Sequence, residues 1–187
     1  MIARAILAGH VPGHNPDPLR PGQCEYEHNV AMVDAITRGR SQLMPIVSYG
    51  GNNDASIIER IHTVQTAGMA VSIEVHHNAV ANPTDCQDYA LVLYRRMDEH
   101  GWSLANRIKR NCEPWLTMHG IRRMIIGAAC SGSSWGYYEA VCLPTHTALI
   151  LECCFFTNPA HSPLIEQPLL RQAYADLIGD AIEGYHV

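Results

Sequence analysis

The sequence has few charged residues and no long apolar run, and these two absences exclude several classes of function. Charged residues make up 17% of the 187 positions against 47% apolar ones, and the formal net charge is −5. Binding to nucleic acid through phosphate contacts needs clustered positive charge, so that class is not expected. No apolar stretch approaches the roughly 18 residues of a membrane span. Residues 1–9 show no positive leader with a long apolar segment, so we expect no secretory signal and synthesis in the cytoplasm.

Paired cysteines and the common zinc-binding helix motif are also missing. The cysteines are odd in number, irregularly spaced and form no C-x-x-C pair, which argues against a disulfide framework, a zinc ribbon and thioredoxin chemistry. No H-E-x-x-H helix fixes two metal ligands at once. We expect most thiols to be small buried apolar groups in a reducing compartment. The seven are Cys24, Cys86, Cys112, Cys130, Cys142, Cys153 and Cys154.

Short apolar runs alternate with helical patterns along the chain. Strands are predicted at residues 4–7, 43–47, 70–75, 89–94 and 147–151. Helices are predicted at 27–38 and 166–185. Another is predicted to begin at the capping residues 52–54 and to end at Gly68, and a fourth at 104–112, with Ser103 as its cap and its end near Pro114. Residues 11–24 and the Gly/Ser-rich residues 127–136 are expected to be loops, the second with Trp135, Tyr137 and Tyr138 following as candidates for stacking on a ligand. This alternation predicts a single α/β domain over residues 1–187, with a mainly parallel, mixed and twisted sheet and helices on both faces.

Polar residues stand where three predicted strands end. His10 follows the first strand, His76 the third and Glu152 the last, while Glu25 lies at the exit of the loop at 11–24. Sites in open α/β sheets gather at the carboxyl ends of strands. Two imidazoles and one carboxylate make a three-ligand zinc site with an open fourth position, where a bound water has a pKa of about 7. A further carboxylate can then move the proton, so the ingredients of amide hydrolysis are present.

Four motifs add a family resemblance to this reading. They are Ala8-Gly9-His10, Glu25-x-x-x-Asn29, Ser72-Ile73-Glu74-Val75-His76-His77-Asn78-Ala79 and Leu151-Glu152-x-x-Phe155-x-Thr157-Asn158-Pro159. In order and spacing the chain resembles the zinc-dependent N-acetylmuramoyl-L-alanine amidases of the amidase 3 type. The resemblance runs from residue 3 to about 185 and is loose over residues 80–145.

The resemblance implies both a site and a reaction. The implied zinc ligands are His10, Glu25 and His76, and the implied catalytic acid/base is Glu152. The implied reaction cleaves the peptidoglycan amide between N-acetylmuramic acid and L-alanine. A bare catalytic domain of this kind resembles a phage or prophage endolysin, a bacteriolytic monomer that acts on the cell wall after release. The alternatives are a zinc peptidase acting within the stem peptide and a non-catalytic wall-binding module on the same fold.

Each implied ligand has a rival close to it in the sequence. The family pattern has His-Gly-Gly where this chain has His10-Val11-Pro12-Gly13-His14, so His14 competes with His10; Glu27 likewise competes with Glu25, and His77 with His76. Strand alternation puts Glu74, His76 and Asn78 on one face and His77 on the other, which makes Glu74 a candidate for orienting a ligand. The competing interpretation of Glu152 is a buried ion pair with Arg122 or Arg123.

Overall fold

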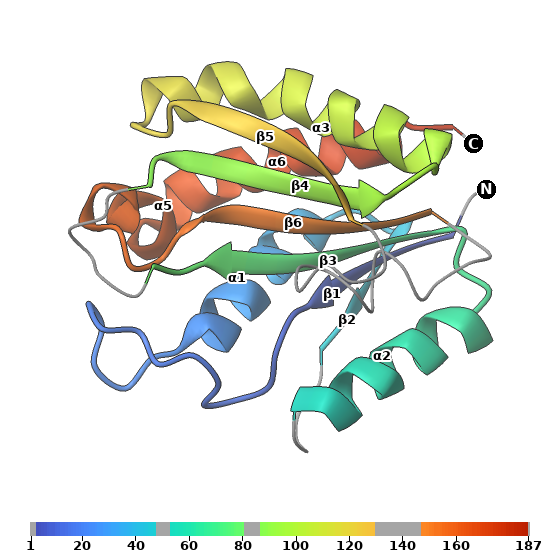
Figure 1. The fold of residues 1–187 in the computed structure, drawn as a ribbon, viewed down its shortest axis with the longest axis horizontal. Coiled ribbons are helices and arrows are strands. Elements are labelled where there is room, and N and C mark those ends of the chain that lie inside the picture. Colours follow the sequence, from blue (N-terminus) through green and yellow to red (C-terminus); the bar gives the residue numbers. More distant parts are fainter. Residues whose placement is uncertain (1–2, 48–52, 81–86, 130–146, 187) are drawn as a thin grey trace.

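The computed structural model describes residues 3–47, 53–80, 87–129 and 147–186, which build one six-stranded sheet (Figure 1). The strands are β1 (Arg4–Ala8), β2 (Leu43–Ile46), β3 (Val71–Asn78), β4 (Tyr89–Arg95), β5 (Arg123–Ala129) and β6 (Thr147–Phe155), in the spatial order β2-β1-β3-β6-β4-β5. In this order β2, β1, β3 and β6 are parallel to one another. β4 pairs antiparallel with β6, and β5 pairs parallel with β4. The predicted mixed, mainly parallel α/β sheet is therefore confirmed.

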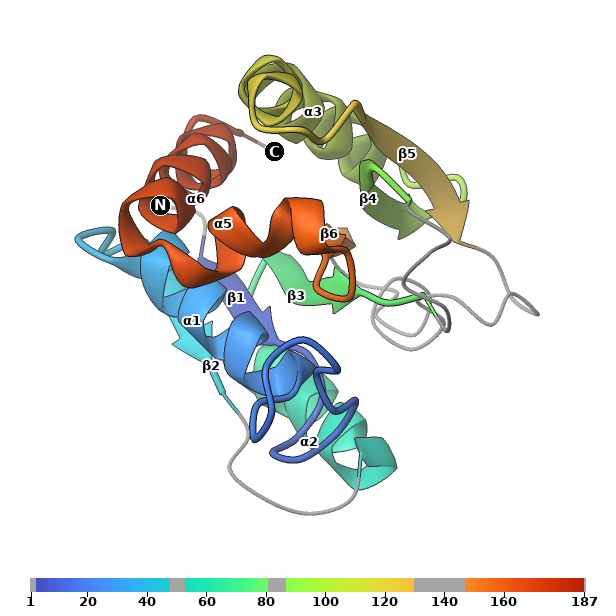
Figure 2. The ribbon, with the colours of Figure 1, turned by 90° about the vertical axis from the view of Figure 1, so that its left-hand side faces the viewer.

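Helices cover both faces of this sheet, as predicted. The larger group contains α1 (Glu25–Thr37), α3 (Glu99–Met118) and α6 (Pro168–Glu183), with the short η1 (Pro159–His161) and α5 (Ser162–Glu166) before α6. Figure 2 shows these helices together on one side and α2 (Asn53–Thr66) on the other. Among the described residues, no helix combines the length and the apolar composition needed to cross a bilayer.

Strand alternation divides the core between the two faces. Ile73 and Val75 of β3 point toward α1, α3 and α6, where they join the largest buried cluster. Ala5 and Leu7 of β1 point the other way and meet Val64 of α2. Burying a side chain of the size of Ile or Leu contributes about 1.5–3 kcal/mol, so both layers stabilise the sheet. On β3 the face toward α2 also carries polar residues, and these build the site described below.

The helix predicted at 104–112 is longer at both ends than its sequence signals suggested. It begins at Glu99, and the N-cap is Asp98, whose side chain accepts a hydrogen bond from the Gly101 amide, so Ser103 lies inside the helix. Pro114 does not end it, although a proline removes one helical hydrogen bond. Buried side chains at four-residue spacing continue on both sides of this proline, at Leu104, Ile108, Cys112 and Leu116. Their packing against the sheet outweighs the lost bond.

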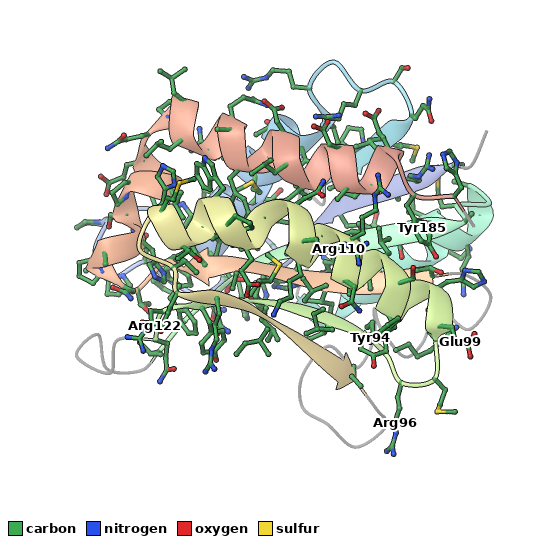
Figure 3. The ribbon with its side chains drawn as sticks, turned by 90° about the horizontal axis from the view of Figure 1, so that it is seen from above. Tyr94, Arg96, Glu99, Arg110, Arg122 and Tyr185 are labelled. Atoms are coloured by element: carbon green, nitrogen blue, oxygen red, sulfur yellow. The ribbon has the colours of Figure 1, made fainter. Side chains whose placement is uncertain are left out.

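Two strand boundaries also differ from the predictions, and β5 is a strand that the sequence interpretation did not include. β3 extends through Asn78 and β6 through Phe155, so His76 and Glu152 lie within strands and not after them. Residues 127–129, predicted as loop, belong to β5, where an added Cβ at Gly127 would lie 2.8 Å from Leu93 Cδ2. Residues 130–136, Tyr137 and Tyr138 lie outside the described residues. Figure 3 shows α3 from above. Tyr94, Arg96 and Glu99 mark the connection from β4 to α3, and Arg122 marks the connection from α3 to β5.

Candidate metal centre

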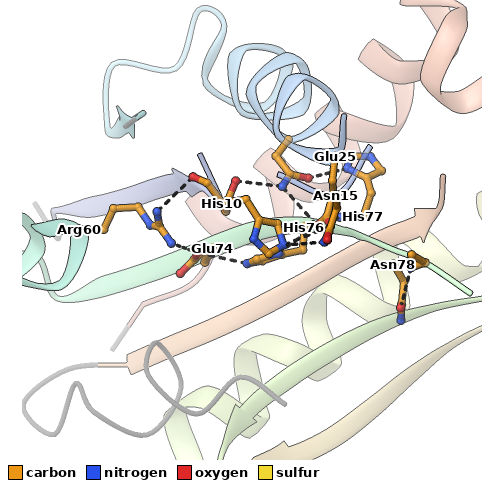
Figure 4. Close-up of polar contacts among 11 residues, drawn as sticks. His10, Asn15, Glu25, Arg60, Glu74, His76, His77 and Asn78 are labelled. Atoms are coloured by element: carbon orange, nitrogen blue, oxygen red, sulfur yellow. Dashed lines mark hydrogen bonds and ion pairs between the residues drawn. The ribbon is translucent and has the colours of Figure 1, made fainter. Parts of the chain in front are cut away.

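Three side chains from distant parts of the sequence converge beside β3 (Figure 4). His10 comes from the turn after β1, Glu25 is the first residue of α1, and His76 lies near the end of β3. His10 Nε2 lies 3.1 Å from Glu25 Oε2, and His76 Nδ1 lies 3.1 Å from Glu25 Oε1. Each residue offers one ligand atom, and these atoms all lie within 4.8 Å of one another, which is close enough to hold one metal ion. The structure thus brings the three predicted ligands together.

The carboxylate of Glu25 is held in place from several directions. Asn15 Nδ2 donates to its Oε2 over 2.7 Å, and the His77 amide donates to its Oε1 over 3.2 Å. Asn29, one turn further along α1, donates to the same Oε1 over 3.4 Å. Burial alone would raise the pKa of Glu25, but the hydrogen bonds with His10 and His76 outweigh it and hold the pKa well below its usual value. The N-terminus of α1 adds its partial positive charge, so Glu25 is an oriented anion.

His10 has a backbone conformation that few residues other than glycine adopt. Its φ is +64°, in the left-handed region, which costs a residue with a Cβ roughly 1–2 kcal/mol. Such strain persists only where the surroundings fix it. Here the His10 carbonyl accepts a hydrogen bond from Arg60 Nη1 over 3.3 Å. The turn directs the imidazole of His10 toward Glu25 (Figure 4).

The imidazole of His76 is fixed at both of its nitrogens. Nδ1 faces Glu25, and Nε2 donates to Glu74 Oε1 over 3.2 Å. Burial lowers the pKa of His76, but the hydrogen bonds to Glu25 and Glu74 outweigh it and raise the pKa well above its usual value. A metal that binds at this imidazole therefore displaces a proton. The predicted orienting role of Glu74 agrees with this contact, whereas Asn78 lies apart from the cluster, after an irregularity in the β3–β6 register (Figure 4).

Two of the rival ligands, His14 and Glu27, are not among the three converging residues. His14 stacks on His10, with ring centroids 4.4 Å apart, but is not one of the three converging residues. Glu27 caps α1, because its Oε2 accepts a hydrogen bond from the Cys24 amide over 2.7 Å. Both are close neighbours of the site without joining it.

His77 points away from His76, as strand alternation predicts. It is buried, and its Nδ1 donates to Asn29 Oδ1 over 2.8 Å. Burial lowers the pKa of His77 to about 3, so the ring is neutral at ordinary pH. Because Asn29 also donates a hydrogen bond to Glu25, His77 is linked to the cluster indirectly and helps to hold Asn29 in place.

Glu152 lies beside the cluster on the neighbouring strand, paired in register with His76. Its Oε2 is buried without a hydrogen-bond partner among the residues that the structure describes. Burial raises the pKa of Glu152 to about 7; the charge of His76 opposes this shift, and the carboxylates of Glu25 and Glu74 add to it. The alternative ion pairs are not observed, because Arg122 pairs with Asp88 over 3.0 Å and Arg123 is exposed.

Besides Asn15, the sequence interpretation did not include Arg60. It lies on α2, is 1% exposed, and its Nη2 donates to Glu74 Oε1 over 2.7 Å. A signal for it was present, since Arg60 stands four residues before Val64 in the predicted apolar stripe of this helix. An arginine in such a stripe is buried only when it is paired, and the pattern could therefore have pointed to a charged partner on the sheet.

Solved structures of N-acetylmuramoyl-L-alanine amidases resemble this chain over its whole length. The catalytic domain of CwlV, an N-acetylmuramoyl-L-alanine amidase from Bacillus (Paenibacillus) polymyxa var. colistinus, has a TM-score of 0.73 at 17% identity, covering 99% of this chain and 98% of that one. An N-acetylmuramoyl-L-alanine amidase from Clostridium difficile 630 has a TM-score of 0.72 at 16% identity, covering 99% and 97%. The catalytic domain of CD27L, an endolysin targeting Clostridia difficile, has a TM-score of 0.69 at 17% identity, covering 100% and 99%.

These similarities define the fold of the chain. It is an α/β fold in which a mixed sheet carries helices on both faces. More narrowly, it is the fold of the N-acetylmuramoyl-L-alanine amidases, so the resemblance drawn from the four motifs is confirmed at the level of the fold. No family profile and no curated protein matches the sequence.

Proposed function

We propose that this protein is a zinc-dependent N-acetylmuramoyl-L-alanine amidase, which hydrolyses the peptidoglycan amide between N-acetylmuramic acid and L-alanine. The observation that carries the proposal is the convergence of His10, Glu25 and His76 beside Glu152, in a fold shared with such amidases. The reaction is an addition of water across one amide bond.

The converging residues fit a zinc ion in their chemistry. Two imidazole nitrogens and one carboxylate oxygen are ligands that Zn²⁺ commonly takes, and a set of three leaves a position open for water or substrate. When bound, zinc would supply a Lewis acid that polarises the carbonyl and lowers the pKa of water.

Glu152 is assigned the proton transfers. Its carboxylate takes a proton from the attacking water and returns it to the alanine nitrogen as the carbon–nitrogen bond breaks. A pKa of about 7 suits both steps, because a group that titrates near the working pH can accept and donate a proton with similar ease. The buried, unpartnered Oε2 is the atom that this role requires to be available, as far as the described residues show.

The setting we propose is that of an endolysin: a monomer that degrades the bacterial cell wall after release from the cell. The likeness to the endolysin catalytic domain of CD27L supports this setting. Size-exclusion chromatography with light scattering tests the monomer, and loss of turbidity of intact bacteria after external addition tests the bacteriolytic activity.

The reaction itself is tested with purified sacculi. We expect the protein to contain about one zinc per chain, to release amines from sacculi, and to lose this activity on chelation and regain it with added zinc. Mass spectrometry should show intact stem peptides with a free L-alanine N-terminus and an uncut glycan. Cleavage inside the stem peptide would instead identify a zinc peptidase. Binding to sacculi without amine release would identify a wall-binding module.

A further inference from the structure

A fully buried ion pair links α2 to β3 behind the candidate metal centre. Arg60 and Glu74 are each 1% exposed, and Arg60 Nη2 lies 2.7 Å from Glu74 Oε1. Removing two charges from water costs several kcal/mol per ion, and apolar residues of similar volume are often equally stabilising. The stability of the fold alone therefore does not account for a charged pair at this position.

The contacts of the pair lead to both candidate histidine ligands. Glu74 Oε1 accepts a hydrogen bond from His76 Nε2 over 3.2 Å, on the side of the ring opposite to Glu25. Arg60 Nη1 donates to the His10 carbonyl over 3.3 Å, where the backbone is left-handed. One guanidinium thus reaches the backbone of one ligand directly and the ring of the other through Glu74 (Figure 4).

We propose that Arg60 and Glu74 are positioning residues of the metal centre, which hold His10 and His76 in the geometry that binds zinc. This inference rests on the proposed zinc site. A carboxylate that accepts a hydrogen bond from one imidazole nitrogen fixes the rotation of the ring and leaves the other nitrogen as the ligand atom. In this chain that arrangement turns Nδ1 of His76 toward Glu25 and His10.

Arginine is suited to this position and lysine is not. The planar guanidinium presents Nη1 and Nη2 to two acceptors at fixed angles, whereas a lysine has a single nitrogen that must be shared between them. Here the two acceptors are the His10 carbonyl, in the turn after β1, and the Glu74 carboxylate on the neighbouring strand β3. We therefore expect Arg60→Lys to keep the charge and still weaken zinc binding.

The test measures zinc affinity and stability separately. Metal-stripped parent, Glu74→Gln, Arg60→Lys, Arg60→Met and the double variant Arg60→Met/Glu74→Met are titrated with zinc against a chelator, and each metal-free protein is unfolded in urea. Loss of an orienting carboxylate or its support typically weakens metal binding about tenfold to hundredfold, and we expect this for all four variants. The double variant should regain stability relative to Arg60→Met, because no unpaired charge is buried, without regaining zinc affinity.

A matched control is Arg4→Met. Arg4 is also buried, at the start of β1 and thus at the opposite end of that strand from His10, and its Nη2 donates to the Tyr185 carbonyl over 2.6 Å. We expect its replacement to lower stability and to leave the zinc affinity of the folded protein within about twofold. The spectrum of the cobalt-loaded protein gives a second readout, which should change in Glu74→Gln and not in Arg4→Met.

Two results would overturn the inference, and they differ. If the parent binds zinc and the folded Glu74→Gln and double variants bind it equally tightly, the ion pair is only structural and the proposed function stands. If the parent binds no zinc, the proposed function fails and the positioning role fails with it. A similar loss of zinc affinity in Arg4→Met would likewise contradict a specific role for Arg60.

Discussion

The imidazole of His76 lies directly on Gly9: a Cβ added to this glycine would be 2.3 Å from His76 Nε2 and Cε1. The backbone of Gly9 has no room to withdraw, since its amide donates to the Val75 carbonyl over 2.9 Å and its carbonyl accepts from Asn29 over 3.1 Å. Any side chain at this position must therefore displace the ring of a candidate zinc ligand.

We predict that Gly9→Ala weakens zinc binding by at least about tenfold, because the displaced ring of His76 leaves its position between Glu25 and Glu74. Chelator competition measures the affinity, and circular dichroism checks the fold. Gly127→Ala is the control: this glycine lies in β5, and an added Cβ meets the far ends of two leucine side chains, Leu93 at 2.8 Å and Leu91 at 3.7 Å. Equal affinities in the parent and Gly9→Ala would contradict the assignment of His76.

Replacing His10 and His14 one at a time should separate a ligand from its neighbour. His10→Ala removes one of the three converging donors, and we expect zinc affinity to fall by about a hundredfold or more. His14→Ala removes only a stacked ring, for which we expect a loss of less than about threefold. Zinc titration of both variants checks this, and the reverse order of effects would make His14 the ligand.

Glu152→Gln should abolish amine release from sacculi while zinc remains bound at parental stoichiometry. The amide of Gln is close in size to the carboxylate but accepts no proton at neutral pH, so only proton transfer is lost. Glu59→Gln, an exposed position on α2, serves as the control and should retain activity. Turnover by Glu152→Gln at the parental rate would show that another group moves the proton.

The same substitution should change how stability depends on pH in the metal-free protein. The pKa of Glu152 is about 7 in the folded state against an ordinary value of 4.5, so between these pH values the folded state retains a proton that the unfolded chain has released. Stability then falls as pH rises through this window. Glu152→Gln lacks this cost and should be more stable than the parent at pH 8, by about 1–3 kcal/mol.

Urea unfolding at pH 4 and pH 8 measures the effect. The stability advantage of Glu152→Gln over the parent should shrink on acidification, because both side chains are then neutral. Glu59→Gln should show no such trend. An advantage that is the same at both pH values would contradict the raised pKa.

The sequence was sufficient for the parts of the site that depend on local order. Strand alternation separated His76 from His77, in agreement with the geometry. The placement of His10 and His76 near the carboxyl ends of strands followed from the predicted α/β sheet, and the structure adds that these two strands are neighbours. These inferences needed only the period of a strand and the direction of the chain.

The parts that failed depend on contacts between distant segments. Pro114 remains helical because residues on both sides of it pack against the sheet, and that packing is invisible in a local pattern. Gly127 belongs to an edge strand for the same reason, since pairing with β4 determines it. The role of Arg60 required knowing that α2 lies over Glu74. In each case tertiary packing overrode a local signal.

The reversed direction of β4 bears on how freely this chain can vary. Among the described residues, the segment β4–α3–β5 contains none of the three converging donors. Because β4 is antiparallel to β6, the turn from β4 into α3 lies at the opposite end of the sheet from these donors. Its described part contributes to the core instead, through buried side chains such as Val92, Leu104 and Ile108. A designer seeking better solubility could change exposed apolar positions of this stretch, such as Trp102 and Met118, without removing a donor of the candidate metal centre.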